Sequence, residues 1–208
     1  MQAPGNLHSI RPVEALSTFP HPNPTIMPRT ISKYLTLFAF AFLLLVPAQA
    51  QDTPAVPEAD PADVESVDAI MAAIYDVISG EAGEERDWDR FMSLFHPEAK
   101  LIPSGCNPEN GQCGLRFITP AEYIDMAGPT LMKDGFFETE RHRVEERYGS
   151  IAHVFSTYDS FYSKSDTEPF NAGINSFQIF NDGSRWWILN IHWQDQRSAG
   201  PIPEEYGG

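Results

Sequence analysis

The sequence predicts an α+β domain in which a cone-like, curved and mostly antiparallel sheet holds three helices packed in its concavity. Helical periodicity occurs only before residue 135, whereas four long strand-like segments follow it. The last of them, residues 185–195 (RWWILNIHWQD), is apolar on both faces. Such a strand usually lies inside a sheet and is covered on both sides. Helices segregated from an antiparallel sheet indicate the α+β class.

Residues 27–50 have the pattern of a signal peptide. A basic start precedes an apolar run at residues 34–46, and a small-residue cleavage site ends at Ala50. The run is shorter than the roughly 20 residues of a spanning helix. We therefore expect cleavage after Ala50 and a periplasmic or secreted protein, with an N-terminal membrane anchor as the alternative. Residues 1–26 are rich in proline and are expected to precede the true start at Met27.

The part of the chain after residue 50 is strongly acidic. It contains 28 of the 29 acidic and 11 of the 14 basic residues, so its net charge is −17. Phosphate backbones and anionic membranes repel such a protein, and neither nucleic acid nor membrane is an expected partner. Residues 51–63 are rich in proline, alanine and acids and predict a linker. We place the domain at residues 64–196 and an exposed tail at residues 197–208.

Three helices are predicted from apolar spacing and end signals. The first covers residues 64–78, with Asp63 as its N-cap and Ser66 as a second choice. The second covers residues 88–95 and is followed by a proline. The third covers residues 120–133 and opens with the Thr-Pro-x-Glu pattern of a capping box.

Two short strands, residues 100–103 and 115–118, flank a loop that contains Cys106 and Cys113. An even number of cysteines in an exported chain favours a disulfide bond. A redox pair more often has the C-x-x-C spacing, and a zinc site needs two further ligands. The four long strands are predicted at residues 136–148, 152–162, 172–180 and 185–194.

Several segments resemble the nuclear transport factor two-like (NTF2-like) superfamily. They are the helix that ends in Phe-His-Pro at residues 87–97, the strand at residues 151–154, and the Asp-Gly turn followed by two tryptophans at residues 182–188. Residues 64–194 resemble its SnoaL-like and ketosteroid isomerase-like branches, and within them an uncharacterised exported bacterial group. The resemblance implies a pocket, and frequently a homodimer joined sheet to sheet. The superfamily includes isomerases, cyclases and dehydratases, but no position in this sequence matches their catalytic carboxylate by motif.

The candidate pocket residues follow from strict alternation along the strands. If Trp186 faces the helices, Asn190 and His192 share that face. Tyr158 and Asn175 are the polar candidates on neighbouring strands. His192 is the candidate general acid or base, because imidazole titrates near neutral pH. The alternative is a hydrogen-bonded histidine at a strand end.

The charged residues of the later strands have ordinary explanations. Arg141 and Arg143 could form an anion site, but an edge strand protected by charge is the favoured interpretation. Asp159 is expected in solvent near a strand end. The histidines lack the spacing of a metal site, so we expect no metal and no cofactor.

These features predict an exported pocket protein that binds a small, partly apolar molecule. One alternative is a cofactor-independent isomerase, dehydratase or cyclase that works by acid–base catalysis at His192. Another is a structural dimerisation module. The face that carries Trp187, Ile191 and Trp193 is expected either beneath the tail or in a homodimer interface.

Overall fold

A computed structural model describes residues 56–208 of the chain. The predicted start at Met27, the signal peptide and most of the linker lie outside the described residues. In the described part, none of the helices is long and apolar enough to cross a membrane. Its elements are α1 (Pro61–Val64), α2 (Val67–Ile78), α3 (Trp88–Ser93), β1 (Phe95–Cys106), β2 (Cys113–Leu115), α4 (Pro120–Asp134), β3 (Phe137–Tyr148), β4 (Ile151–Phe161), β5 (Asn171–Asn181), β6 (Trp186–Asp195), α5 (Gln196–Ala199) and the 3₁₀ helix η1 (Glu204–Tyr206).

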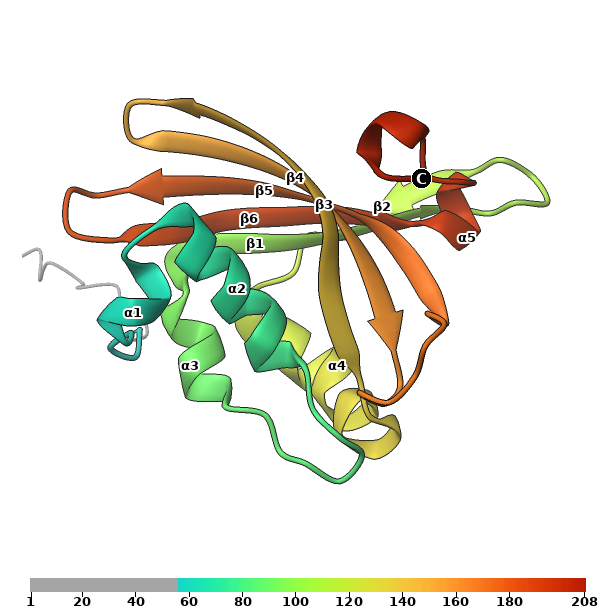
Figure 1. The fold of residues 1–208 in the computed structure, drawn as a ribbon, viewed down its shortest axis with the longest axis horizontal. Coiled ribbons are helices and arrows are strands. Elements are labelled where there is room, and N and C mark those ends of the chain that lie inside the picture. Colours follow the sequence, from blue (N-terminus) through green and yellow to red (C-terminus); the bar gives the residue numbers. More distant parts are fainter. Residues whose placement is uncertain (1–55) are drawn as a thin grey trace, which may run out of the picture. The chain divides into compact units, whose positions relative to one another are not determined.

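The six strands form one mixed, open sheet in the order β2-β1-β6-β5-β4-β3. Only β1 and β6 run parallel, and the other four pairings are antiparallel. Strand β6 is interior and β3 is an edge strand, as predicted. Helices α2, α3 and α4 lie on one side of the sheet (Figure 1). The described part has five α-helices instead of three, because α1 and α5 are additional single turns.

The predicted first helix is divided in two. Ser66, the second choice of cap, starts α2 by accepting a hydrogen bond from the Ala69 amide at 3.0 Å. Asp63 lies inside α1 instead, and its carboxylate binds the guanidinium of Arg90 at 2.7 Å. The prediction of Asp63 as the N-cap was therefore wrong. Helix α1 also starts at Pro61, inside the segment expected to be a linker.

The boundaries around β1 differ from the prediction for a tertiary reason. Helix α3 ends at Ser93, and Phe95 is already a strand residue because it pairs in parallel with Ile188 of β6. Strand β1 therefore starts five residues before the predicted Lys100. The capping box of α4 is present as predicted: Thr119 accepts from the Glu122 amide and Glu122 accepts from the Thr119 amide.

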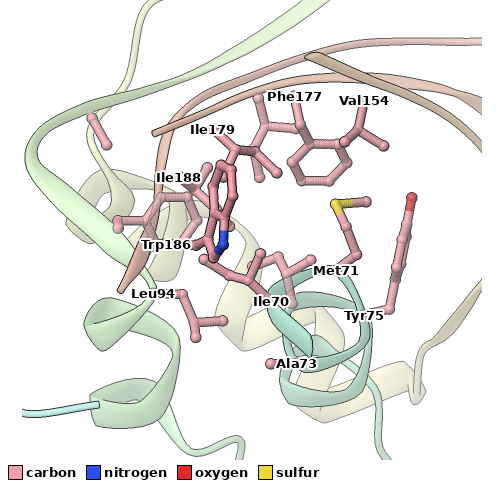
Figure 2. Packing of buried hydrophobic residues seen from close by; sticks show 14 of the residues in the cluster. Ile70, Met71, Ala73, Tyr75, Leu94, Val154, Phe177, Ile179, Trp186 and Ile188 are labelled. Atoms are coloured by element: carbon pink, nitrogen blue, oxygen red, sulfur yellow. The ribbon is translucent and has the colours of Figure 1, made fainter. Parts of the chain in front are cut away.

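The hydrophobic core lies between α2 and the apolar half of the sheet. Figure 2 shows Ile70 and Met71 of α2 directed towards Phe177, Ile179 and neighbouring strand residues. These side chains are at most 1% exposed. A helix that buries one face completely against a sheet holds both elements in a defined register.

Arg86 stabilises the loop between α2 and α3 through hydrogen bonds to backbone carbonyl groups. Its side chain is buried, and it donates hydrogen bonds to the carbonyl oxygens of Ile78, Gly80, Glu84 and Leu131. Burial lowers the pKa of Arg86. The guanidinium satisfies carbonyl groups at the ends of α2 and α4 that have no partner within their helices.

Two further segments contact the sheet: the loop between β1 and β2, and the C-terminal segment. Cys106 and Cys113 form the predicted disulfide bond, which closes the loop between β1 and β2. Most residues of the C-terminal segment are exposed, and the segment lies on the side of the sheet opposite the helices (Figure 1). Thr157 donates to the Tyr206 carbonyl at 2.8 Å, and the Tyr206 ring contacts Phe155. The proline-rich composition of this segment gave no indication of these contacts.

Candidate ligand-binding site

A cavity of about 550 Å³ lies between the sheet and helices α2, α3 and α4. This volume is within the range of small-molecule sites. Its apolar lining comes from helices, strands and connecting loops: Ile74, Ile78, Phe91, Leu101, Tyr123, Met126, Ala127, Leu131, Phe136, Phe170, Phe177, Ile191 and Trp193. An apolar body of moderate size therefore finds aliphatic and aromatic contacts on several sides.

The strand register collects polar residues in one part of the sheet, and several of them line the cavity. Three successive rows of cross-strand neighbours on the helix-facing side are Glu138–Ser160–Asn171, Glu140–Tyr158–Gly173–Asp195 and Arg143–Ser156–Asn175–Trp193. The next row, Glu145–Val154–Phe177–Ile191, is apolar except for Glu145 on the edge strand. The sheet therefore changes from polar to apolar along the strands, and the cavity spans the change.

Glycine at position 173 makes room for the phenol of Tyr158. A Cβ atom at residue 173 would lie 2.4 Å from the Tyr158 hydroxyl oxygen. The Tyr158 ring therefore crosses β5 where that strand has no side chain. Tyr158 is 4% exposed and lines the cavity, as predicted.

Glu138 is the titratable group that sequence reasoning missed. It is half-buried on the cavity wall, where Asn175 donates to its Oε1 at 3.2 Å and Ser160 donates to its Oε2 at 3.4 Å. Burial raises the pKa of Glu138 to about 7, and the two hydrogen bonds oppose part of this rise. A carboxyl group that changes charge near neutral pH can bind a donor, or accept and return a proton.

Three tyrosines surround this carboxyl group: Tyr75 from α2, Tyr123 from α4 and Tyr158 from β4. Burial is the main cause that raises the pKa of each, and the charge of Glu138 raises it further. All three phenols therefore stay protonated at physiological pH. Tyr75 bonds to Ser156 at 2.7 Å and accepts from Asn175 at 3.2 Å.

Asp195 marks another polar part of the cavity. Its Oδ2 accepts from Arg197 at 2.8 Å and from Asn171 at 3.2 Å, and its Oδ1 accepts from the Ser198 amide at 3.1 Å. Burial opposes ionisation, but the hydrogen bonds from Arg197 and Ser198 prevail and lower the pKa of Asp195. The Arg197 guanidinium is thus already paired with a carboxylate, which weakens its attraction for an anionic ligand.

The structure does not place Asn190 and His192 in this cavity. Strand β6 has one extra residue, Leu189, between the pairs Ile179–Ile188 and Gln178–Asn190. Such a bulge shifts all following side chains to the opposite face. Ile191 and Trp193 therefore face the helices. The sequence-based placement of Asn190 and His192 towards the helices, and of Ile191 and Trp193 on the outer face, was wrong.

His192 lies instead on the outer side of the sheet. It is exposed, its Nε2 is 3.0 Å from the Ser104 hydroxyl, and it lines a groove beside Pro201 and Pro203 of the C-terminal segment. Trp186 is buried in the apolar core between α2 and the sheet (Figure 2) and does not line the cavity. Of the predicted ligand-binding residues, the structure brings together Tyr158 and Asn175.

The arginines of β3 are held by carboxylates. Arg143 binds Glu140 at 2.7 Å and Asp68 at 2.6 Å, and Arg141 lies 3.4 Å from Asp159. These pairs favour the edge-strand interpretation over an anion site. Asp159, expected in solvent, has only 14% of its side-chain surface exposed. In residues 56–208, no group of three or more histidine, cysteine or acidic side chains is arranged to hold a metal ion.

No family model and no curated protein match this sequence. Among solved structures, the chain is similar to a Nostoc punctiforme protein of unknown function with a cystatin-like fold (TM-score 0.47, 10% identity, 62% of this chain and 87% of that chain). It is also similar to an NTF2-like superfamily protein from Salmonella enterica (TM-score 0.41, 14% identity, 63% and 86%). A third is an NTF2-like protein of unknown function from Shewanella baltica (TM-score 0.38, 12% identity, 62% and 96%).

Two of these three structures are NTF2-like proteins. The identities and TM-scores are low, so these similarities carry no assignment of substrate or activity. The function must be argued from the cavity itself.

Proposed function

We propose that this protein binds a small, partly apolar molecule in the cavity between the sheet and the helices. The observation that carries the proposal is a carboxyl group, Glu138, set into an otherwise largely apolar and aromatic wall. The apolar body of a ligand would displace water from the aromatic side chains, and its polar group would meet Glu138. A few polar groups in an apolar concavity are typical of small-molecule sites.

The charges favour a ligand that donates a hydrogen bond, and above pH 7 a cationic amine. Glu138 is negative above its pKa of about 7, and Asp195 is also ionised because its pKa is lowered. The nearby cation Arg197 is paired with Asp195. The whole chain carries a net charge of −15, which repels anions at long range.

A matched set of naphthalene probes tests this proposal by titration calorimetry: 2-naphthylmethylamine, 2-naphthalenemethanol and 2-naphthoate. At pH 8 we expect the amine to bind at least about tenfold more tightly than the carboxylate, a difference of roughly 1.4 kcal/mol. Glu138→Gln should remove the preference for the amine and leave the alcohol largely unaffected. Glu146→Gln is the matched control, because Glu146 is an exposed carboxylate on the same strand. Absence of binding by all three probes would contradict the proposal.

A second candidate function is proton transfer in a cofactor-independent isomerase, dehydratase or cyclase, with Glu138 as the base in place of His192. It is favoured by a pKa of about 7, which suits a base that works near neutral pH. Tyr158, protonated and beside the same carboxyl group, is a candidate donor to a developing oxyanion. Conversion of a β,γ-unsaturated ketone to its conjugated isomer, followed by ultraviolet absorbance, tests this. Activity that survives in Glu138→Gln would exclude Glu138 as the base.

Export of the protein is part of the proposal. The signal-peptide pattern before residue 51 supports it, as does the disulfide bond between Cys106 and Cys113, since such bonds persist in oxidising compartments. The expected mature protein starts at Gln51. Amino-terminal sequencing of protein isolated from its native cell compartment tests this, and a first residue upstream of Gln51 would contradict it.

Association of two copies through the outer side of a curved, cone-like sheet is also proposed. Exposed Val144, Tyr148 and Ile151 gather on the β3–β4 hairpin, on the face opposite the helices. The C-terminal segment covers part of that face, where Tyr206 contacts Phe155. A second copy would therefore use the hairpin end of the sheet. Sedimentation of the wild-type protein and of Tyr148→Glu should give a dimer and a monomer, respectively.

A further inference from the structure

A chain of hydrogen bonds leads from the edge strand β3 into the cavity. The Arg143 guanidinium binds the Glu140 carboxylate through Nε at 2.9 Å and through Nη2 at 2.7 Å. The Ser156 hydroxyl donates to Glu140 Oε1 at 2.5 Å. The hydroxyl groups of Ser156 and Tyr75 are 2.7 Å apart. The bulge at Arg141 is what places Glu140 and Arg143 on the same side of the sheet.

The chain continues from Tyr75 to the cavity carboxyl group. Asn175 Nδ2 lies 3.2 Å from the Tyr75 hydroxyl oxygen and 3.2 Å from Glu138 Oε1. Asn175 and Tyr75 are 6% and 7% exposed, so water does not easily replace these partners. The orientation of the Asn175 amide therefore matters directly to Glu138.

The direction of every hydrogen bond in the chain follows from Glu140. A carboxylate held by a guanidinium only accepts, so the single proton of Ser156 is committed to Glu140. The Ser156 oxygen is then free only to accept, and Tyr75 must donate to it. The Tyr75 oxygen in turn accepts, which requires the amide nitrogen, and not the oxygen, of Asn175 at this position.

We propose that Glu140 and Ser156 are positioning residues that fix the orientation of the Asn175 amide at the cavity carboxyl group. The amide nitrogen is held against Glu138, where it stabilises the ionised form. In the opposite orientation the amide oxygen would lie against Glu138, and only a protonated carboxyl group could donate to it. Glu140 and Ser156, which do not line the cavity, thus favour the ionised form of Glu138.

The relevance of this selection to ligand binding rests on the proposed function. The ionised form attracts an amine or removes a proton from a bound molecule, and the protonated form does neither. The hydrogen bond from Asn175 opposes the effect of burial on the pKa of Glu138. Loss of the chain should therefore move the titration of Glu138 to higher pH.

Ser156→Ala interrupts the chain and changes no charge near Glu138. The titratable and charged groups that line the cavity and the adjoining pocket stay in place: Tyr75, Asp76, Glu81, Glu84, Tyr123, Glu140, Arg143, Tyr158, Lys164, Asp195 and Arg197. The Tyr75 hydroxyl would then need another acceptor, and the nearby amide of Asn175 supplies one by turning its oxygen towards it.

The test is the pH midpoint of Glu138, measured without ligand by carbon NMR of labelled glutamate and assigned with Glu138→Gln. We expect Ser156→Ala to raise the midpoint by about 0.5 to 1 pH unit, which is the size of one neutral hydrogen bond. Ser156→Thr keeps a hydroxyl group and should have the same midpoint as the wild type. Ser176→Ala is the matched control, because Ser176 bonds to His153 on the outer face of the sheet.

Glu140→Ala tests the start of the chain, with Glu145→Ala as its control. Both carboxylates lie beside Arg143, but Ser156 donates only to Glu140 among them. The midpoint should be higher in Glu140→Ala than in Glu145→Ala. An unchanged or lower midpoint in Ser156→Ala overturns the proposal, and if that variant does not fold, equal midpoints in the Glu140 and Glu145 variants do so. Because no ligand is present, failure of ligand binding does not affect this result.

Discussion

Replacement of Glu138 by glutamine should stabilise the fold at alkaline pH but not at acidic pH. The pKa of Glu138 rises from an ordinary 4.5 to about 7 on folding. Between these values the folded protein holds a proton that the unfolded chain has lost, so stability falls as the pH rises through this window. With about 1.4 kcal/mol for each pH unit, ionised Glu138 costs on the order of 3 kcal/mol above pH 7. Glutamine avoids that cost and can still accept from Asn175.

Urea unfolding of the wild type and of Glu138→Gln, both with the disulfide bond intact, measures this effect at pH 4.5 and pH 8. The free energy of unfolding of the variant, minus that of the wild type, should increase by about 2 to 3 kcal/mol between the two pH values. Glu146→Gln, which changes an exposed carboxylate, should show no such dependence. A difference that is the same at both pH values would refute the burial of an ionisable group at position 138.

Two further substitutions test how the cavity wall and its supporting loop are built. Gly173→Ala places a Cβ atom 2.4 Å from the Tyr158 hydroxyl and should destabilise the fold by about 2 kcal/mol or more, whereas Gly114→Ala, with open space around it, should change stability by less than about 0.5 kcal/mol in the same urea titration. Arg86→Met leaves several buried carbonyl groups without donors and should cost about 3 kcal/mol, whereas exposed Arg116→Met should cost little, as measured by thermal unfolding.

The elements of the fold could be predicted where the signals are local. The apolar spacing of α2, the capping box of α4 and the four long strands all correspond to the structure. The disulfide bond could also be predicted, because two cysteines in a turn-rich loop have few other uses. The features that local signals missed depend on distant partners: α3 gives way to a strand at Phe95 because β6 lies beside it, and the C-terminal segment contacts Phe155 and Thr157.

The candidate site was predicted only in part. Tyr158 and Asn175 lie on regular stretches of β4 and β5, where alternation holds, and both line the cavity. Glu138 was missed because β3 carries charged residues on both of its faces, which is typical of a solvated edge strand. Its burial follows from pairing with Ser160 and from the helices opposite, neither of which leaves a local signal.

Two bulges decide which chemistry the cavity contains. Without Leu189 as an extra residue in β6, regular alternation would turn His192 towards the helices, and the acid–base group of the cavity would be an imidazole. With the bulge, Trp193 fills that side and leaves Glu138 as the group in the cavity that titrates near pH 7. The bulge at Arg141 of β3 brings Arg143 to the inner face, where its guanidinium binds Glu140 at the start of the hydrogen-bond chain. An imidazole in an apolar cavity loses its charge more readily on burial, whereas a carboxyl group keeps its proton to higher pH. Binding of an amine should therefore strengthen as the pH rises, because Glu138 becomes negatively charged. A buried histidine would give the opposite pH dependence for an anion, because it loses its positive charge as the pH rises.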